Sequence, residues 1–180
     1  MSQKFNELNK HHIDFIEKQK MFFVATALET GHVNLSPKGM DSFKVIDNKT
    51  VIWLNLTGSG NETSTHVQRN SRMTIMFCSF EGPPLIFRIY GNAVEIRPSD
   101  QNWQQYYSNF KYYIGARQIF LVNIEFVASS CGYAVPQYSF IGNRTQLLDW
   151  ADKRGADGVR QYWADKNITS LDGLPTNIQA

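Results

Sequence analysis

The sequence has few residues of the kinds that bind metals or form disulfides. It contains two cysteines, Cys78 and Cys131, which stand far apart and without CxxC spacing. A buried, reduced pair is therefore favoured over a disulfide framework or a zinc site. The four histidines stand alone or side by side, without further ligands at metal-binding spacing. We therefore expect no metal site.

An excess of charge and long apolar runs are also missing. Eighteen Lys and Arg residues against sixteen Asp and Glu residues give a net charge of +2, without long basic runs. A nucleic-acid partner is therefore not expected. The amino end has no apolar core, and the longest apolar stretches, such as MFFVATAL at 21–28, are far shorter than a membrane span. We expect a cytoplasmic protein without a membrane segment.

What the sequence does contain is a set of short apolar runs separated by turn residues. With 180 residues, of which 42% are hydrophobic, the chain can bury one sizeable core, so we expect a single domain over residues 1–180. Runs rich in β-branched and aromatic residues predict about six strands, and Gly91 is expected to mark a bulge or a close approach of backbones. These runs lie at 21–28, 32–37, 43–46, 50–54, 72–80, 85–96 and 118–129.

Helices are predicted at the start, middle and end of the chain. Helical spacing of apolar residues indicates one helix over 5–18 and a second helix that begins near Pro98. The second helix carries an aromatic stripe, which we assign to core packing and which consists of Trp103, Tyr106, Tyr107 and Phe110. Shorter helical segments are expected at 63–70, 146–152 and 158–163. The strands and helices do not alternate, so the pattern favours a mainly β (α+β) fold, an antiparallel barrel with helical additions.

The stretch GSGNETSTH, residues 58–66, raises the first functional question. Gly58 and Gly60 flank a turn directly before the helix expected at 63–70, where free backbone N–H groups and the helix dipole favour an anion. Ser59, Asn61 and three further hydroxyl residues add short donors. The alternative is that Asn61 or Ser59 only caps the helix. The stretch has neither a complete GxGxxG nor the Lys of a Walker loop.

A second element is the turn SPKG, residues 36–39. Pro37 stiffens it, and Lys38 offers a point charge suited to a phosphate, although a lone Lys at a turn is commonly just solvated surface.

These residues carry a resemblance to a known family. The segments VNLSPKG (33–39), residues 51–84 and RIYG (88–91) resemble the pyridoxamine 5'-phosphate oxidase-related group of flavin-binding split barrels. The tail segments CGYAVP (131–136) and KNITSLDGLP (166–175) resemble those of one bacterial branch of that group. The resemblance implies a six-stranded split barrel that forms a homodimer, with FMN in each of two clefts built by both subunits.

The resemblance also implies which residues hold the flavin. Lys38 stands where the family places a Lys near the flavin, and Trp53, Leu54 and Asn55 correspond to the strand beside the cofactor. The family's basic pair after the loop is replaced by Glu62 and Thr63. The phosphate would then be bound by the loop amides around Gly60 and Asn61 and by the hydroxyls of Ser59, Thr63 and Ser64. A basic residue from elsewhere in the chain would also be needed, and the candidates are Lys38, Arg72 and Arg88.

Two further positions are left open between a binding role and a structural one. The family's Gln beside the flavin ring aligns near Ile86, and Arg88 is the nearest polar residue with the same side-chain direction. His66 either approaches the cofactor or is a satisfied structural histidine. The segment at 131–136 either walls the partner's cleft or only ends a strand.

The function implied is an FMN-dependent oxidoreductase that acts on an unidentified small molecule, with NAD(P)H as electron source. The Arg-x-His by which the true oxidases bind pyridoxamine phosphate is absent, so that substrate is not expected. A flavin supplies the redox chemistry, which fits a sequence without a catalytic triad or paired carboxylates. The alternative from another class is a non-catalytic split barrel that binds flavin or haem.

Overall fold

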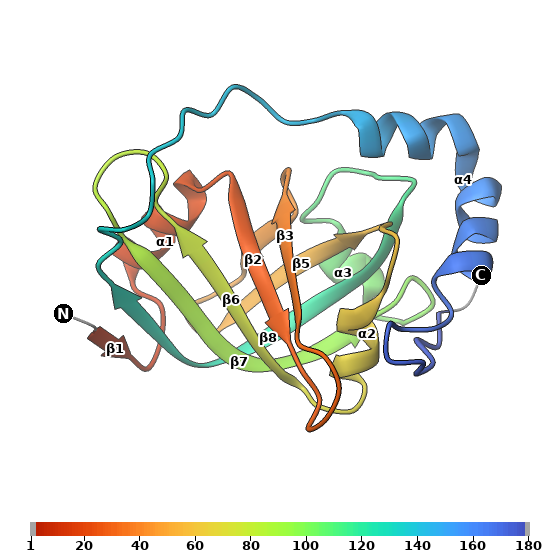
Figure 1. The fold of residues 1–180 in the computed structure, drawn as a ribbon, viewed down its shortest axis with the longest axis horizontal. Coiled ribbons are helices and arrows are strands. Elements are labelled where there is room, and N and C mark those ends of the chain that lie inside the picture. Colours follow the sequence, from red (N-terminus) through yellow and green to blue (C-terminus); the bar gives the residue numbers. More distant parts are fainter. Residues whose placement is uncertain (1–2, 179–180) are drawn as a thin grey trace.

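The computed structural model describes residues 3–178, and its centre is a curled antiparallel sheet (Figure 1). The sheet order is β3-β2-β6-β7-β8-β5-β4, and β1 pairs with β8. The mainly β class and the split-barrel arrangement are confirmed, with eight strands in the described residues where about six were expected. The strands are β1 (Gln3–Phe5), β2 (Met21–Thr26), β3 (Asn34–Gly39), β4 (Phe43–Val45), β5 (Thr50–Leu56), β6 (Arg72–Cys78), β7 (Ile86–Ile96) and β8 (Ala116–Ser130).

The helix expected over 5–18 is wrong in its first half. Gln3–Phe5 forms β1 and pairs with residues 127–129 of β8, while the helix α1 spans only Lys10–Lys18. Asn9 caps it, because its side chain accepts a hydrogen bond from the His12 N–H at 3.0 Å and its own N–H donates to His12 Nδ1 at 3.2 Å. This reciprocal cap starts the helix at Asn9, whatever the spacing of the apolar residues before it.

Two layers of buried side chains hold the barrel together. The interior cluster centres on large side chains that are almost fully buried, among them Trp53, Phe77, Phe87 and Phe120. A second cluster forms on the outer face of β5 and β8, where the short helix α3 (Trp103–Tyr107) and its aromatic side chains cover Ile52 and Ile119. The packing role expected for that aromatic stripe is confirmed. Because both faces of β8 are covered, its first five residues are all buried.

Gly91 marks a bulge between β7 and β8, as its position in the sequence predicts. The register shifts between Tyr90 and Gly91. A Cβ at this position would lie 2.3 Å from the backbone oxygen of Asn123, so only glycine allows the two strands to approach this closely.

The chain beyond β8 leaves the barrel and returns to it. Residues 131–145 cross the top of the molecule in Figure 1 and lead into α4 (Gln146–Lys166). Gly155, with φ of 66°, divides α4 into two arms, which match the two predicted helical segments. Cys131 lies on this crossing segment and is exposed, contrary to expectation, whereas Cys78 is buried. Within residues 3–178 there is no helix of the length and apolarity needed to cross a membrane.

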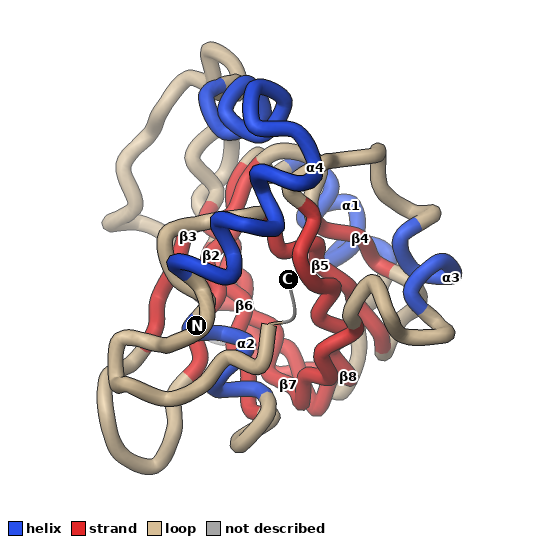
Figure 2. The backbone as a smooth tube through the Cα atoms, turned by 90° about the vertical axis from the view of Figure 1, so that its right-hand side faces the viewer, coloured by secondary structure: helices blue, strands red, loops and turns tan. Residues whose placement is uncertain are grey.

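The opening of the barrel lies between β3 and β5. Strand β3 pairs with β2, and β5 pairs with β4 and β8, but no pairing joins β3 to β5 in the described part of the chain. The loop after β5 leads directly into the helix α2 (Glu62–Val67), which lies at one end of the sheet (Figure 2). The polar residues of the 58–66 stretch are therefore brought to the mouth of this opening.

Candidate functional site

A cleft of about 410 Å³ occupies the opening between β3 and β5. Clefts of this size are typical of small-molecule sites. Its walls come from β3 and the turn after it, the end of β5, the following loop, the start of α2, and one residue each of β8 and α4. The residues that line it are Asn34, Ser36, Pro37, Lys38, Gly39, Met40, Ser42, Leu54, Asn55, Leu56, Thr57, Gly58, Ser59, Gly60, Asn61, Glu62, Thr63, Arg117 and Leu147.

Strand β3 presents a polar face to the barrel. Side chains alternate along a strand, and here Asn34, Ser36 and Lys38 are partly buried while Leu35 and Pro37 point to solvent. Asn34 donates to the hydroxyl of Thr63 at 3.0 Å, which links β3 to α2 across the opening. This reversed pattern, with apolar residues outside, indicates that the inner face of β3 serves binding rather than core packing.

The loop at residues 58–60 has its carbonyl groups engaged on one side. Asn167 Nδ2 donates to the oxygens of Gly58 and Ser59 at 3.1 and 3.2 Å, and Arg117 Nη1 donates to the oxygen of Gly60 at 2.9 Å. In a trans peptide the N–H points opposite to the carbonyl, so the next N–H groups in the chain point away from these partners. No described residue accepts a hydrogen bond from the N–H groups of residues 58–61.

The helix cap that was the alternative for this loop is not formed. Asn61 occupies the N-cap position of α2, but its side chain makes no capping hydrogen bond. Its oxygen instead accepts from Asn55 Nδ2 at 3.3 Å, and Asn55 also donates to Gln118 at 2.9 Å. Because α2 has only six residues, its dipole adds little, and the cleft's affinity for an anion must come from amides and side-chain cations.

Arg117, which sequence reasoning missed, supplies one of those cations. It lies at the start of β8, where pairing of Gln118 with Asn55 brings it beside the loop. Its side chain is 4% exposed, and Nη1 donates to Gly60 O and to Asn167 Oδ1 at 2.9 and 2.8 Å. The only local signal was a charged residue directly before the apolar run of a buried strand.

Three buried polar atoms lack a hydrogen-bond partner among residues 3–178, and all three belong to residues that line this cleft. They are Ser36 Oγ, Asn61 Nδ2 and Arg117 Nε. Buried polar groups are nearly always paired, since leaving one unpaired costs about 1 to 3 kcal/mol. Two nitrogen donors and a hydroxyl at one cleft therefore fit a ligand with several acceptor oxygens, such as a phosphate ester.

The charges of the cleft support the same interpretation. Lys38 and Arg117 form no ion pair with any carboxylate in the described residues. Burial, and secondly the charge of Arg117, lowers the pKa of Lys38 to about 8, and burial lowers the pKa of Arg117 to about 10. Both groups remain charged at neutral pH without a counter-ion, although a buried charge is costly unless paired. An anion in the cleft would relieve this cost.

Glu62 is the one carboxylate among the described residues that line the cleft. Its Oε2 accepts a hydrogen bond from the N–H of Leu171 at 2.9 Å, so the C-terminal loop holds one of its oxygens. It stands where the resemblance leads one to expect a basic residue. Arg117, from a distant part of the chain, supplies a positive charge to the same cleft.

The structure brings seven of the eleven predicted site residues to the cleft and places four outside it. The seven are Lys38, Leu54, Asn55, Ser59, Gly60, Asn61 and Thr63. The four are Trp53, Ser64, His66 and Arg88. Trp53 is fully buried and stacks on Phe120, and Lys38 Nζ lies 5.3 Å from the centre of its ring.

The other three residues outside the cleft have partners of their own. His66 is buried, with Nδ1 at 3.0 Å from the hydroxyl of Thr26. Ser64 donates its hydroxyl to Glu95 of β7 at 2.7 Å, which directs it away from the cleft. Arg88 lies on β7 and donates to Ser130 at 3.2 Å. None of these three side chains lines the cleft of the chain to which it belongs.

A second, larger hollow of about 1820 Å³ lies beneath the crossing segment. Phe15, Phe80, Leu85 and Tyr138 contribute apolar side chains to it, and Lys38 lines it as well as the smaller cleft. It exceeds the usual size of a small-molecule site. The two hollows are therefore neighbours that meet at Lys38.

The family model and a curated relative agree on one family. The family model described as pyridoxamine 5'-phosphate oxidase matches residues 8–131. The pyridoxamine 5'-phosphate oxidase family protein ustO of Aspergillus flavus is 34% identical over 191 residues, which cover 95% of this chain and 76% of that protein.

Two solved structures share the fold. HupZ of Group A Streptococcus superposes with a TM-score of 0.55 at 21% identity and covers 68% of this chain and 98% of its own. A protein of Lactobacillus delbrueckii, described as a pyridoxamine 5'-phosphate oxidase by similarity, gives a TM-score of 0.54 at 17% identity, with 68% and 94% covered.

Proposed function

Because the chain belongs to the pyridoxamine 5'-phosphate oxidase family, we propose that the cleft between β3 and β5 binds the phosphate end of FMN. The observation that carries the proposal is the group of unpaired buried atoms on Ser36, Asn61 and Arg117. Lys38 and Arg117 would supply the positive charge, and the amides of residues 58–61 would supply neutral donors. Phosphate oxygens accept such charge-assisted hydrogen bonds well.

We further propose that the protein is a flavin-dependent oxidoreductase that acts on a small molecule other than pyridoxamine phosphate. When bound, FMN supplies the hydride or electron transfer. The protein's own residues then have three tasks, which are to bind the phosphate, to exclude water from the cleft and to hold the charge of Lys38 beside Trp53. NAD(P)H is the proposed electron source.

The second candidate is a non-catalytic member of the family that stores or senses its ligand. The cleft's described lining contains no His, Asp or Cys, the residues that most often act as proton carriers or nucleophiles. A haem ligand is less favoured at this cleft, because haem iron is commonly held by His, Cys, Tyr or a His/Met pair, and of these the described lining offers only Met40.

We also propose that the functional unit is a homodimer. The crossing segment exposes Tyr138, Phe140 and Ile141, with Ile141 fully exposed, above a hollow too large for one small ligand. A second copy seated there would bury these side chains and would approach the cleft at Lys38.

Titration of the apoprotein with FMN, followed by flavin fluorescence, tests the cofactor proposal. The wild type is expected to bind FMN, and mass spectrometry of denatured protein is expected to find FMN. Arg117→Met is expected to weaken binding by about 1.5 to 3 kcal/mol, the range for a hydrogen bond to a charged group. Bleaching of the flavin absorbance by NADPH would distinguish the enzyme from the binder.

Arg88→Met is the matched control, because Arg88 is partly buried but lies outside the cleft. It is expected to leave FMN affinity unchanged. If Arg88→Met weakens FMN and Arg117→Met does not, the phosphate is bound elsewhere. A protein that ignores FMN altogether, or shows a Soret band, would overturn the flavin proposal.

A further inference from the structure

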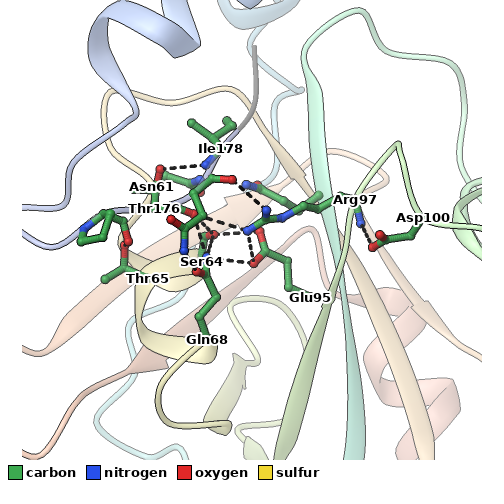
Figure 3. Close-up of polar contacts among 12 residues, drawn as sticks. Asn61, Ser64, Thr65, Gln68, Glu95, Arg97, Asp100, Thr176 and Ile178 are labelled. Atoms are coloured by element: carbon green, nitrogen blue, oxygen red, sulfur yellow. Dashed lines mark hydrogen bonds and ion pairs between the residues drawn. The ribbon is translucent and has the colours of Figure 1, made fainter.

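The C-terminal segment, residues 167–177, is seated against α2. The backbone oxygen of Thr176 accepts hydrogen bonds from Ser64 Oγ at 3.2 Å, from Gln68 Nε2 at 2.7 Å and from Arg97 at 3.4 Å. Figure 3 shows Thr176 enclosed by these side chains together with Glu95. The segment is therefore a fixed part of the fold, next to the loop that forms the cleft.

Asn167 begins this segment and reaches the cleft loop. Its side chain is fully buried, and it carries the two bonds to the oxygens of Gly58 and Ser59 and the bond from Arg117 described above. Its backbone oxygen accepts from the hydroxyl of Thr176, which ties it to the rest of the segment. All the hydrogen bonds of the Asn167 side chain therefore serve the loop and Arg117.

The chemistry of an amide suits this position better than that of a carboxylate. A carboxamide donates two hydrogen bonds and also accepts, whereas an ionised Asp only accepts. An Asp here would repel the carbonyl oxygens of Gly58 and Ser59 and would neutralise Arg117. Asn167 instead orients both partners and leaves the guanidinium charge uncompensated and available to a ligand.

We infer that Asn167 is a positioning residue for the phosphate end of the cleft, which it shapes from the C-terminal segment by fixing the 58–60 peptides and Arg117. The inference rests on the proposed function for its ligand. It adds that the ability to distinguish a phosphorylated from an unphosphorylated flavin depends on a residue distant in sequence from the family's cleft motifs.

The test compares FMN with riboflavin, which lacks the phosphate, on apoprotein of the wild type and of Asn167→Asp. The wild type is expected to bind FMN at least tenfold more tightly. Asn167→Asp is expected to lose most of that ratio while its riboflavin affinity changes by less than threefold. Equal weakening of both flavins would indicate a merely structural role and overturn the inference, as would an unchanged ratio.

Two further variants keep the result decisive. Asn167→Ala is measured in the same way, and it decides the question if thermal melting shows that Asn167→Asp does not fold. Asn177→Gly is the control, because Asn177 lies in the same segment with φ of 54° and bonds to Gln68 rather than to the cleft. It is expected to keep the wild-type ratio, and a loss there equal to that of Asn167→Asp would overturn the inference.

Inorganic phosphate separates this inference from the flavin proposal. If the wild type binds neither flavin, the flavin proposal fails, and the thermal shift with phosphate decides the role of Asn167. A shift in the wild type that disappears in Asn167→Asp supports the inference. No shift in the wild type, or an equal shift in both proteins, overturns it.

Discussion

Lys38 and Arg117 are the two residues that give the cleft its chemical character. Arg117 is buried and Lys38 is partly buried, neither has a carboxylate partner in the described chain, and burial together with the charge of Arg117 lowers the pKa of Lys38. Such an arrangement is unfavourable in the ligand-free protein and favourable once an anion is bound. The pH dependence of binding should therefore follow Lys38, whose pKa is near 8.

FMN affinity is predicted to be close to its maximum at pH 7, to be about twofold lower at pH 8, where half of Lys38 has lost its proton, and to fall further as pH rises. Lys38 is charged below its pKa of about 8 and loses its proton above it, whereas a bound phosphate favours the charged amine. The decline is expected to approach tenfold per pH unit until the raised pKa of the complex is reached. Fluorescence titrations at pH 7 to 9.5 measure it.

Lys38→Arg and Lys38→Ala are the comparisons for this prediction. Arginine stays charged over the whole range, so Lys38→Arg is expected to remove the decline above pH 8. Lys38→Ala is expected to weaken FMN binding by about 1 to 3 kcal/mol at pH 7 and also to remove the pH dependence. An unchanged decline in both variants would show that another group titrates.

The residues of the site differ in how far the sequence could predict them. Ser59 and Asn61 stand in a short polar stretch with turn chemistry, so local pattern made them candidates, whereas Lys38 was singled out by the resemblance to the family and lies within β3 rather than in a turn. Arg117 and Asn167 have no such signal, because the β5–β8 register and the fold of the C-terminal segment bring them to the cleft. Contacts between residues 50 or more positions apart depend on tertiary structure, which spacing along one sequence does not contain.

At the scale of the elements, the bulge at Gly91 allows the next prediction. Gly91→Ala is predicted to destabilise the protein by about 1 to 3 kcal/mol, because the added Cβ would meet the backbone oxygen of Asn123. Urea unfolding measures the change. Val94→Ala on the same strand is the control, since Val94 is 53% exposed and its loss is expected to change stability little. Equal stability of Gly91→Ala and wild type would contradict the close approach.

The elements that were predicted well are those with a strong local pattern. The β2–β3 hairpin, β6, β7 and the two arms of α4 follow apolar runs bounded by turn residues or glycine. The short strand β4 was predicted within the run at 43–46, whereas β1 carries too few residues to show a period and pairs only with the end of β8. The capping pair Asn9 and His12, rather than apolar spacing, would have located the start of α1.

For the whole molecule, the exposed crossing segment predicts self-association. Sedimentation of the wild type is expected to show a dimer. Ile141→Asp is expected to weaken dimerisation at least tenfold, because the interface would then bury a charged side chain in place of the exposed apolar side chain of Ile141. Val33→Asp, at another exposed apolar residue, is the control and is expected to remain dimeric. A wild-type monomer that holds FMN tightly would contradict the proposed assembly.

The attachment of Asn167 to the cleft also has a consequence for biosynthesis. Strands β1 to β8 precede α4 in the chain, so the barrel can assemble on the ribosome before residue 167 has been synthesised. A nascent barrel at that stage keeps the bond from Arg117 to the oxygen of Gly60, but Arg117 lacks its acceptor on Asn167, and the oxygens of Gly58 and Ser59 lack their donor. Loading of the cofactor is therefore expected to follow translation of the tail, which would keep incomplete chains from sequestering it.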